Sequence, residues 1–87
     1  MRLNVVYLAS VRERVGRHEE QIEIAQHACN LGDLLALLSA KYAGLFNDPD
    51  IGCAVSGQIQ PMHTSAITAC QLQDEDEIAF FPPMTGG

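Results

Sequence analysis

The residues best suited to chemistry stand at the end of the sequence, where an apolar stretch meets two prolines and then two glycines, Phe80-Phe81-Pro82-Pro83-Met84-Thr85-Gly86-Gly87. Pro82 and Pro83 have no backbone N–H and hold φ near about −65°, so a β-sheet ladder cannot continue beyond them. Gly86 and Gly87 have no Cβ, which leaves the α-carboxylate of Gly87 unhindered. The stretch from Pro82 can extend roughly 20 Å, at ~3.3 Å per residue. Such a tail can place its carboxylate in the active site of another protein.

A terminal pair of glycines is a weak signal by itself. Glycine makes up about 7% of average proteins, and chain ends are often frayed and without function, so an inert terminus stays open as an alternative. The signal becomes more specific through its neighbours, a strand-like apolar run, two prolines and a short linker. We therefore predict a domain over residues 1–81 that carries a flexible functional tail over residues 82–87.

The rest of the sequence offers little chemistry of its own. Its three cysteines, Cys29, Cys53 and Cys70, are widely spaced and form no Cys-x-x-Cys pair, which argues against a zinc site or a redox pair. The acidic residues 74–77 lack the ligand spacing of a calcium loop and are interpreted as a solvated turn. No phosphate-binding glycine loop and no Ser/His/Asp set is recognisable. We expect no metal and no bound cofactor, which leaves the terminal carboxylate as the reactive group.

Composition narrows the class of protein further. The chain has 87 residues, enough for one domain with a modest core, and 47% of them are hydrophobic, as in globular proteins. A net charge of −6 argues against nucleic-acid binding, which needs clustered lysine and arginine, and fits a protein that docks on a basic partner. No apolar run reaches the ~18–20 residues of a membrane span. The start of the sequence lacks a signal-peptide pattern, so we expect a cytoplasmic location.

The first third of the sequence predicts a strand, a short helix and a second strand. Residues 2–8 alternate as a strand whose second face also becomes apolar toward its end. Ser10 is followed three residues later by a glutamate, a capping-box pattern that predicts a helical turn over about residues 11–15. Residues 18–25 then alternate apolar and polar side chains after an exposed Glu19-Glu20 approach.

The remaining sequence predicts one main helix and several short strands. Asn30 is suited to cap the helix, and Asp33 places a negative charge in its first turn. The leucines and the tyrosine at helical spacing define a single buried face: Leu31, Leu34, Leu35, Leu38 and Tyr42. Ser56-Gly57 is typical of a tight hairpin, residues 61–69 are expected to be irregular, and residues 78–81 form the last strand.

This order of elements predicts an α+β fold. A mixed sheet of about five strands with one main helix across one face is the compact solution for a chain of this kind. The β-grasp, or ubiquitin-like, fold has this order. Its sheet leaves the second face free for solvent or for a partner.

Two segments of the sequence resemble a known family. Residues 7–16, Tyr-Leu-Ala-Ser-Val-Arg-Glu-Arg-Val-Gly, and residues 74–87, an acidic turn followed by a strand and Phe-Pro-Pro-Met-Thr-Gly-Gly, resemble the small, sulfur-carrier subunit of molybdopterin synthase. The similarity in order and spacing covers nearly the whole chain, and the tail is its specific part. One departure is the connection over residues 61–70, which is longer than is usual in the family.

The resemblance implies a role for the tail. An E1-like adenylyltransferase would use ATP to adenylate the Gly87 carboxylate, and a persulfide donor protein would convert it to a thiocarboxylate. The large subunit of molybdopterin synthase would then accept the tail, including Met84, Thr85 and Gly86, into its active site, in a heterotetramer. There the sulfur would be delivered to cyclic pyranopterin monophosphate. A ubiquitin-like protein modifier, or a sulfur carrier of a thiamine-type pathway, uses the same kind of terminus and stays open as an alternative.

The parity of the last strand predicts where a partner docks. Neighbouring residues of a strand point to opposite faces of the sheet, so one of Phe80 and Phe81 must face outward. If Phe80 joins the core, Phe81 belongs to an exposed apolar patch beside Pro82 and Pro83. We expect this patch to include Val6 and to bind partners through Leu8, Ile59 and Phe81. Coverage of the patch by the chain's own loops is the alternative.

Overall fold

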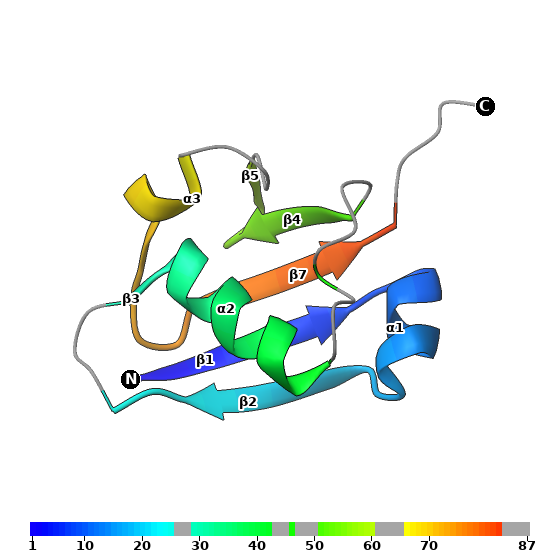
Figure 1. Cartoon of the computed structure of the whole chain (residues 1–87). Helices are drawn as coiled ribbons and strands as arrows, with labels where there is room; N and C mark the ends of the chain where they lie inside the picture. The colour runs from blue at the N-terminus through cyan, green and yellow to red at the C-terminus, as the bar shows by residue number, and fades with distance from the viewer. Residues whose placement is uncertain (26–28, 43–45, 47–50, 61–65, 83–87) are drawn as a thin grey trace.

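The computed structural model describes residues 1–25, 29–42, 46, 51–60 and 66–82 (Figure 1). Its main feature is a five-stranded sheet with the strand order β2-β1-β7-β4-β5. The strands of this sheet are β1 (Arg2–Tyr7), β2 (Glu19–Glu23), β4 (Gly52–Val55), β5 (Gln58–Gln60) and β7 (Glu77–Phe81). Strands β1 and β7 pair in parallel and the other neighbours are antiparallel, so the sheet is mixed. This is the sheet that the order of elements predicts.

The main helix, α2 (Leu31–Lys41), crosses one face of the sheet, as Figure 1 shows. Its first turn has the predicted cap. The Asn30 side chain accepts a hydrogen bond from the Asp33 N–H at 2.8 Å, and the Asp33 carboxylate accepts one from the Asn30 N–H at 3.0 Å. This reciprocal pair satisfies two backbone donors at the helix start. On the buried side of α2, Leu31, Leu34 and Leu38 are fully covered.

Two shorter helices connect strands. Helix α1 (Ala9–Val15) joins β1 to β2 and ends at Gly16, whose φ of 90° is readily adopted by glycine. The prediction of Ser10 as its cap is wrong. Leu8 occupies the N-cap position without a side-chain cap, and Ser10 lies inside the helix. Helix α3 (Ala66–Ala69) lies in the segment expected to be irregular, of which residues 61–65 are outside the described part.

A second, small sheet was not predicted from the sequence. Strands β3 (Cys29–Asn30) and β6 (Gln71–Leu72) pair antiparallel beside the start of α2. The Leu31 N–H donates a hydrogen bond of 2.9 Å to the Cys70 carbonyl. The sheet therefore links the entry of α2 to the segment that leads into β7.

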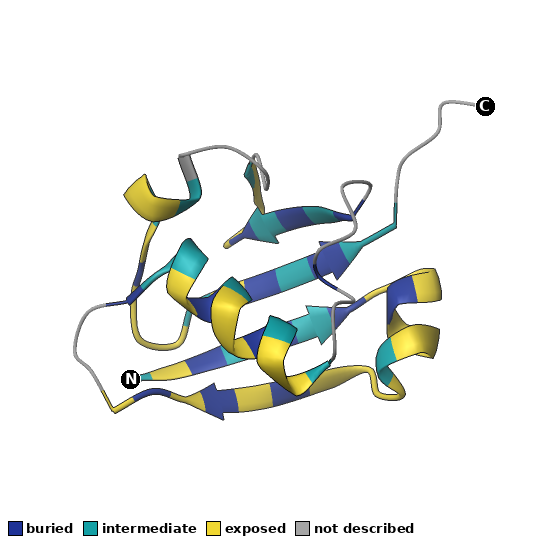
Figure 2. Cartoon of the chain, viewed as in Figure 1, coloured by how far each residue is buried: buried dark blue, intermediate teal, exposed yellow. Residues whose placement is uncertain are grey.

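The core lies between the sheet and α2 (Figure 2). Alternate residues of the central strands point into it and are buried: Leu3, Val5 and Tyr7 of β1, Cys53 and Val55 of β4, and Ile78 and Phe80 of β7. We call this covered side the closed face and the opposite side the open face. In the part of the chain that the structure describes, no helix is long and apolar enough to cross a membrane.

Candidate functional site

The tail begins at the end of a central strand. Strand β7 is third of the five in the sheet and is paired on both sides, with β1 and with β4. Pairing ends at Phe81, and Pro82 follows without a backbone N–H to continue it. A strand held on both sides gives the tail a fixed origin. Residues 83–87 lie outside the described part, so the roles of Pro83, Met84, Thr85, Gly86 and Gly87 stay predictions.

Phe80 points into the closed face, as predicted. Its ring is completely buried and stacks on the Tyr7 ring, with 6.2 Å between centroids and 18° between planes. The Phe46 ring approaches its edge at 4.7 Å and 64°. Such offset and edge-to-face geometries are favourable between aromatic rings. Phe80 therefore anchors the origin of the tail in an aromatic cluster with Tyr7 and Phe46.

The centre of the open face is a row of apolar residues that crosses four strands. The register pairs Val6 with Ala79, Ala79 with Ala54, and Ala54 with Ile59. Residues paired in this way point to the same side of a sheet. Val6, Ala54 and Ala79 are half-buried, and Ile59 on the edge strand β5 is 72% exposed. The row makes the middle of this face apolar where solvent-facing polar residues are the rule.

The predicted partner-binding residues Leu8 and Phe81 lie toward the tail end of this face. The Leu8 N–H donates a hydrogen bond of 2.9 Å to the Phe80 carbonyl, and the Leu8 side chain is 44% exposed. Phe81 and Pro82 are half-buried. We call the following residues the open-face patch: Val6, Leu8, Ala54, Ile59, Ala79 and Phe81. The parity prediction for Phe80 and Phe81 is thus confirmed, whereas partner binding by the patch stays a prediction.

The main polar site that sequence reasoning missed is Glu20, which is buried instead of belonging to an exposed approach. Only 9% of it is exposed. The Tyr7 hydroxyl donates to its carboxylate at 2.7 Å, the Lys41 ammonium donates at 2.6 Å, and the Tyr42 hydroxyl donates as well. The spacing could have revealed it, because Glu20 shares the parity of Ile22 and Ile24 on β2.

Electrostatics explain how a carboxylate is tolerated there. Burial by itself raises the pKa of Glu20, but hydrogen bonds from Lys41, Tyr42 and Tyr7 outweigh burial and hold the pKa below its usual value. Burial and the bond to Glu20 raise the pKa values of Tyr7 and Tyr42, so both hydroxyls stay protonated as donors. Lys41 is the only lysine of the chain. The cluster joins β2 and β1 to the end of α2 and leaves Glu20 ionised.

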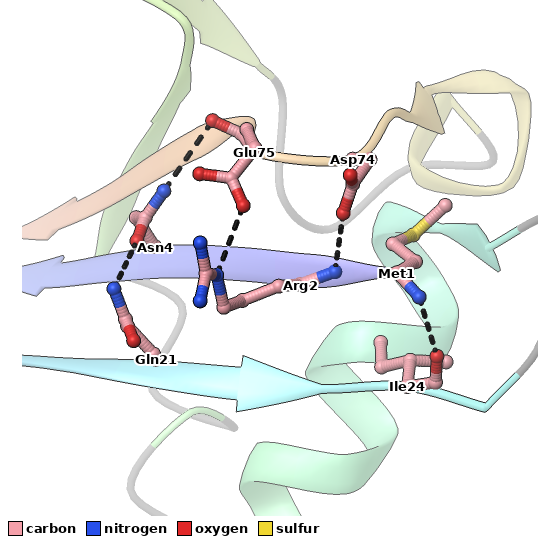
Figure 3. A network of polar contacts seen from close by, with 7 residues as sticks. All are labelled: Met1, Arg2, Asn4, Gln21, Ile24, Asp74 and Glu75. Atoms are coloured by element: carbon pink, nitrogen blue, oxygen red, sulfur yellow. Dashed lines mark hydrogen bonds and ion pairs between the residues drawn. The ribbon is translucent and has the colours of Figure 1, made fainter.

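The acidic turn before β7 is used to hold strand β1 (Figure 3). The Asp74 carboxylate accepts a 2.6 Å hydrogen bond from the Arg2 N–H, and the Glu75 carboxylate accepts one of 2.9 Å from the Arg2 guanidinium. The Glu75 carbonyl accepts a further bond from the Asn4 side chain. Met1 closes the same edge, because its ammonium donates to the Ile24 carbonyl at 2.9 Å. These contacts give the turn a structural role that the reading as a solvated turn did not include.

The turn and the tail lie at opposite ends of β7, because the turn precedes Glu77 and the tail follows Phe81. The tail end is instead close to α1, which starts directly after Leu8 and carries Arg12 and Arg14. The acidic turn therefore does not place its negative charge beside the tail.

The described residues include no alternative reactive centre. Within them, no group of three or more His, Cys, Asp or Glu side chains could hold a metal ion. Cys29 and Cys53 are buried and Cys70 is half-buried. Burial, and to a lesser extent Cys70, raise the pKa of Cys53 to about 12, so its thiol stays protonated at neutral pH.

Comparison with known sequences places the chain in a family. The sequence profile of the ThiS family matches residues 5–87. The chain is 31% identical to the molybdopterin synthase sulfur carrier subunit of Haemophilus influenzae, over 98% of this chain and 99% of that protein. It is 33% identical to the subunit of the same name from Mycobacterium tuberculosis, over 100% and 99% of the two chains.

Comparison with solved structures agrees on the fold. A putative molybdopterin converting factor subunit 1 from Pyrococcus furiosus has a TM-score of 0.77 at 23% identity, over 97% of this chain and 99% of that one. A chain in the complex of subunits 1 and 2 of the molybdopterin-converting factor from Helicobacter pylori has a TM-score of 0.66 at 20% identity, over the whole of both chains.

Small archaeal modifier protein 1 from Methanosarcina acetivorans is also similar, with a TM-score of 0.71 at 25% identity, over 99% and 96% of the chains. The fold shared by these proteins is the ubiquitin-like β-grasp. The curated relatives match this chain over nearly their full length as well. The chain therefore belongs to the ThiS family and, within it, to the molybdopterin synthase sulfur carrier subunits.

Proposed function

We propose that this chain carries sulfur as a thiocarboxylate on Gly87 and delivers it to cyclic pyranopterin monophosphate in molybdenum cofactor biosynthesis. The observation that carries the proposal is the end-to-end similarity to molybdopterin synthase sulfur carrier subunits, in a chain whose own sequence ends in Gly-Gly. The structure adds a physical reason for a carrier role. In the described part, the tail follows a strand that is paired on both sides. The same part contains no cluster of side chains that could hold a metal, and its Cys53 thiol is not activated.

The chemistry starts from a carboxylate, which is a poor electrophile. In an E1-like adenylyltransferase, the Gly87 carboxylate attacks the α-phosphate of ATP, and pyrophosphate leaves. The terminal sulfur of a protein persulfide then attacks the acyl-adenylate carbonyl, and AMP leaves. A thiol cleaves the resulting S–S bond, which gives the thiocarboxylate on Gly87 and a disulfide on the donor side. The absence of side chains at Gly86 and Gly87 leaves the carbonyl open to each nucleophile.

The partner that completes the site is the large subunit of a molybdopterin synthase, with which the chain would form a heterotetramer in the cytoplasm. The similar protein from Helicobacter pylori was solved as a complex of subunits 1 and 2. The open-face patch supplies the docking surface, because it is apolar, contiguous across four strands and next to the origin of the tail. Aromatic residues such as Phe81 are common anchors at such interfaces.

Deletion of Gly87 tests the proposal. We expect the truncated chain to unfold at the same temperature as the parent, because the residue follows Pro82 and lies beyond the sheet ladder. The carboxylate would move back by about 3.3 Å, out of reach of ATP and of the persulfide. ATP–pyrophosphate exchange with the activating enzyme should therefore be lost, and mass spectrometry should detect no oxygen-to-sulfur exchange. Normal adenylation of the truncated chain would contradict the carrier role.

A protein modifier is the second candidate, and the similarity to small archaeal modifier protein 1 favours it. Both functions need the same activation of Gly87, so the products distinguish them. A carrier accumulates as a free chain in which one oxygen is replaced by sulfur. A modifier appears as larger species in which Gly87 is joined to a lysine of another protein. Intact-mass analysis of the protein isolated from cells separates the two outcomes.

A further inference from the structure

Gly52 lies directly under the ring of Phe81. The two residues are cross-strand partners at the ends of β4 and β7, so both face the open side of the sheet. A Cβ built on Gly52 would lie 2.7 Å from Cζ and 2.9 Å from Cδ2 of the Phe81 ring, and closer still to Cε2. Real Cβ atoms do not approach other heavy atoms this closely. The ring therefore occupies the space that any side chain at position 52 would need.

The requirement for glycine here is one of space and not of backbone conformation. Gly16 and Gly57 have positive φ angles, whereas Gly52 does not and lies within a regular strand. Glycine weakens a strand interior, and its presence often marks a close approach by another group. An aromatic side chain laid over a glycine of the neighbouring strand compensates by covering the exposed backbone.

We propose that Gly52 is a positioning residue that lets the Phe81 ring pack directly against the sheet and thereby shapes the docking surface at the origin of the tail. Phe81 is the last residue of the β7 ladder, so its ring is the last side chain that fixes the strand before Pro82. A ring displaced by a side chain at position 52 would stand away from the sheet. It would then collide with a partner whose surface fits the ring packed against the sheet. The functional consequence rests on the proposed docking of the large subunit.

We call the packing of the Phe81 ring on Gly52 the seat. The two neighbouring strands hold the end of β7 in different ways. On the β1 side, the end of β7 is held by the backbone hydrogen bond from the Leu8 N–H to the Phe80 carbonyl. On the β4 side, the described open-face residues of this strand are both small, Gly52 and Ala54. A side chain at position 52 should therefore displace the Phe81 ring, while the backbone hydrogen bond between Leu8 and Phe80 can remain.

A double-mutant cycle with Gly52→Ala and Phe81→Ala tests the seat. Titration calorimetry with the large subunit should show an affinity loss of about tenfold or more for Gly52→Ala alone, which corresponds to ~1.4 kcal/mol. When Phe81 is already alanine, the additional Gly52→Ala substitution should change the affinity by less than about twofold, because no ring remains to be displaced. Additive losses, or an unchanged affinity of the Gly52→Ala protein, would overturn the proposal.

Two controls separate ring displacement from a general defect. Gly32→Ala makes the same chemical change in α2, away from the open face, and should leave the affinity unchanged. If Gly52→Ala fails to fold, the double variant decides the matter. A folded double variant supports a clash between the new Cβ and the ring, whereas an unfolded one shows that Gly52 is needed for another reason and contradicts the seat.

A measurement on the isolated chain tests the contact between Phe81 and Gly52 independently of the proposed function. The ring current of Phe81 should shift the Gly52 Hα resonance upfield, and Phe81→Ala should abolish that shift. A Gly52 Hα at the same position in both proteins would disprove the contact. If the upfield shift is present but the parent chain neither binds the large subunit nor transfers sulfur to its substrate, the proposed function fails while the seat remains.

Discussion

Phe80 and Phe81 are adjacent in one strand and identical in type, yet they lie in opposite environments. Phe80 is completely buried between Tyr7 and Phe46 on the closed face. Phe81 lies half-buried over Gly52 on the open face. The difference follows from the two-residue period of a strand and from the position of helix α2, which crosses one face of the sheet (Figure 1). Apolar residues on the closed face stabilise the fold, and those on the open face form the surface at which we propose that a partner docks.

The two faces also differ in the size of their side chains. The closed face contains aromatic rings, leucines and isoleucine, which fill the space under α2. The centre of the open face carries alanines at positions 54 and 79, and glycine at position 52 lies next to them at the tail end, beside Phe81. Small residues at the centre leave little side-chain volume between the strands and a partner. An apolar surface of small residues beside the origin of a tail fits the docking that we propose.

The largest effect should come from truncating the closed-face ring. Phe80→Ala removes a fully buried aromatic side chain and leaves a cavity, which typically costs about 3–5 kcal/mol of stability. For a domain of this size, that is a large part of the total free energy of unfolding. Urea denaturation should show a strongly lowered midpoint. If Phe81→Ala, the matched control, were the more destabilised of the two, the assignment of the faces would be reversed.

The polar border of the closed face should have the next largest effect. Glu20→Gln removes a charge that accepts hydrogen bonds from Tyr7, Lys41 and Tyr42. Hydrogen bonds to charged groups contribute about 1.5–3 kcal/mol, so a loss of this order is expected at neutral pH. Gln21→Ala on the same strand is a matched control, because Gln21 is exposed. Thermal unfolding of both variants compares a buried and an exposed position of β2.

The stability should also depend on pH through Glu20. Its pKa in the folded protein lies below the usual value of 4.5, so the unfolded chain binds its proton more readily. The contribution of Glu20 is therefore complete above that value and is lost as the pH falls through the lower, folded pKa. The free energies of unfolding of the parent and Glu20→Gln proteins should approach each other as the pH is lowered from neutral into the acid range below the usual pKa of a glutamate. A constant difference between them would show that Glu20 is not the ionised acceptor.

Phe81→Ala should affect binding more than folding. The half-buried ring should contribute no more than about 1 kcal/mol to stability, because only part of its surface is removed from water. At an interface, an aromatic anchor often contributes ~2 kcal/mol, roughly 30-fold in affinity. Titration calorimetry with the large subunit, together with urea denaturation, measures both quantities. Unchanged affinity would show that the patch is not the docking surface at this end.

Local patterns predicted most of the fold because they depend on short-range rules. The alternation in β1, β2 and β7 follows the strand period, and the Asn30–Asp33 cap follows from backbone donors that need partners. The parity of Phe80 and Phe81 likewise requires only that residues 78–81 form a strand. The hairpin turn at Ser56-Gly57 was predictable because tight hairpins need positive φ angles, which glycine adopts readily. Gly57 has a φ of 86°.

The features that were missed depend on contacts between distant segments. The Glu20 carboxylate is stabilised by Tyr42, which is 22 positions away in the sequence. Local sequence patterns do not predict a hydrogen bond between residues so far apart. The small β3–β6 sheet joins segments that lie on either side of α2 and the β4–β5 hairpin. The seat of Phe81 on Gly52 also requires the β4–β7 register, which the sequence did not provide.

The smallest effect is expected at the border of the open face. Ile59 is 72% exposed on the edge strand β5, so Ile59→Ser should change the free energy of unfolding by less than about 0.5 kcal/mol. Its place in the apolar row with Ala54 predicts a loss of affinity for the large subunit of about fivefold or less, because border contacts contribute less than central anchors. Gln58→Ala changes an exposed residue of the same strand that belongs to the opposite parity, and it should leave the affinity unchanged. Equal affinities for the Ile59→Ser and Gln58→Ala proteins would restrict the docking surface to the region around Phe81 and Leu8. A loss confined to Ile59→Ser would extend it across the sheet to β5.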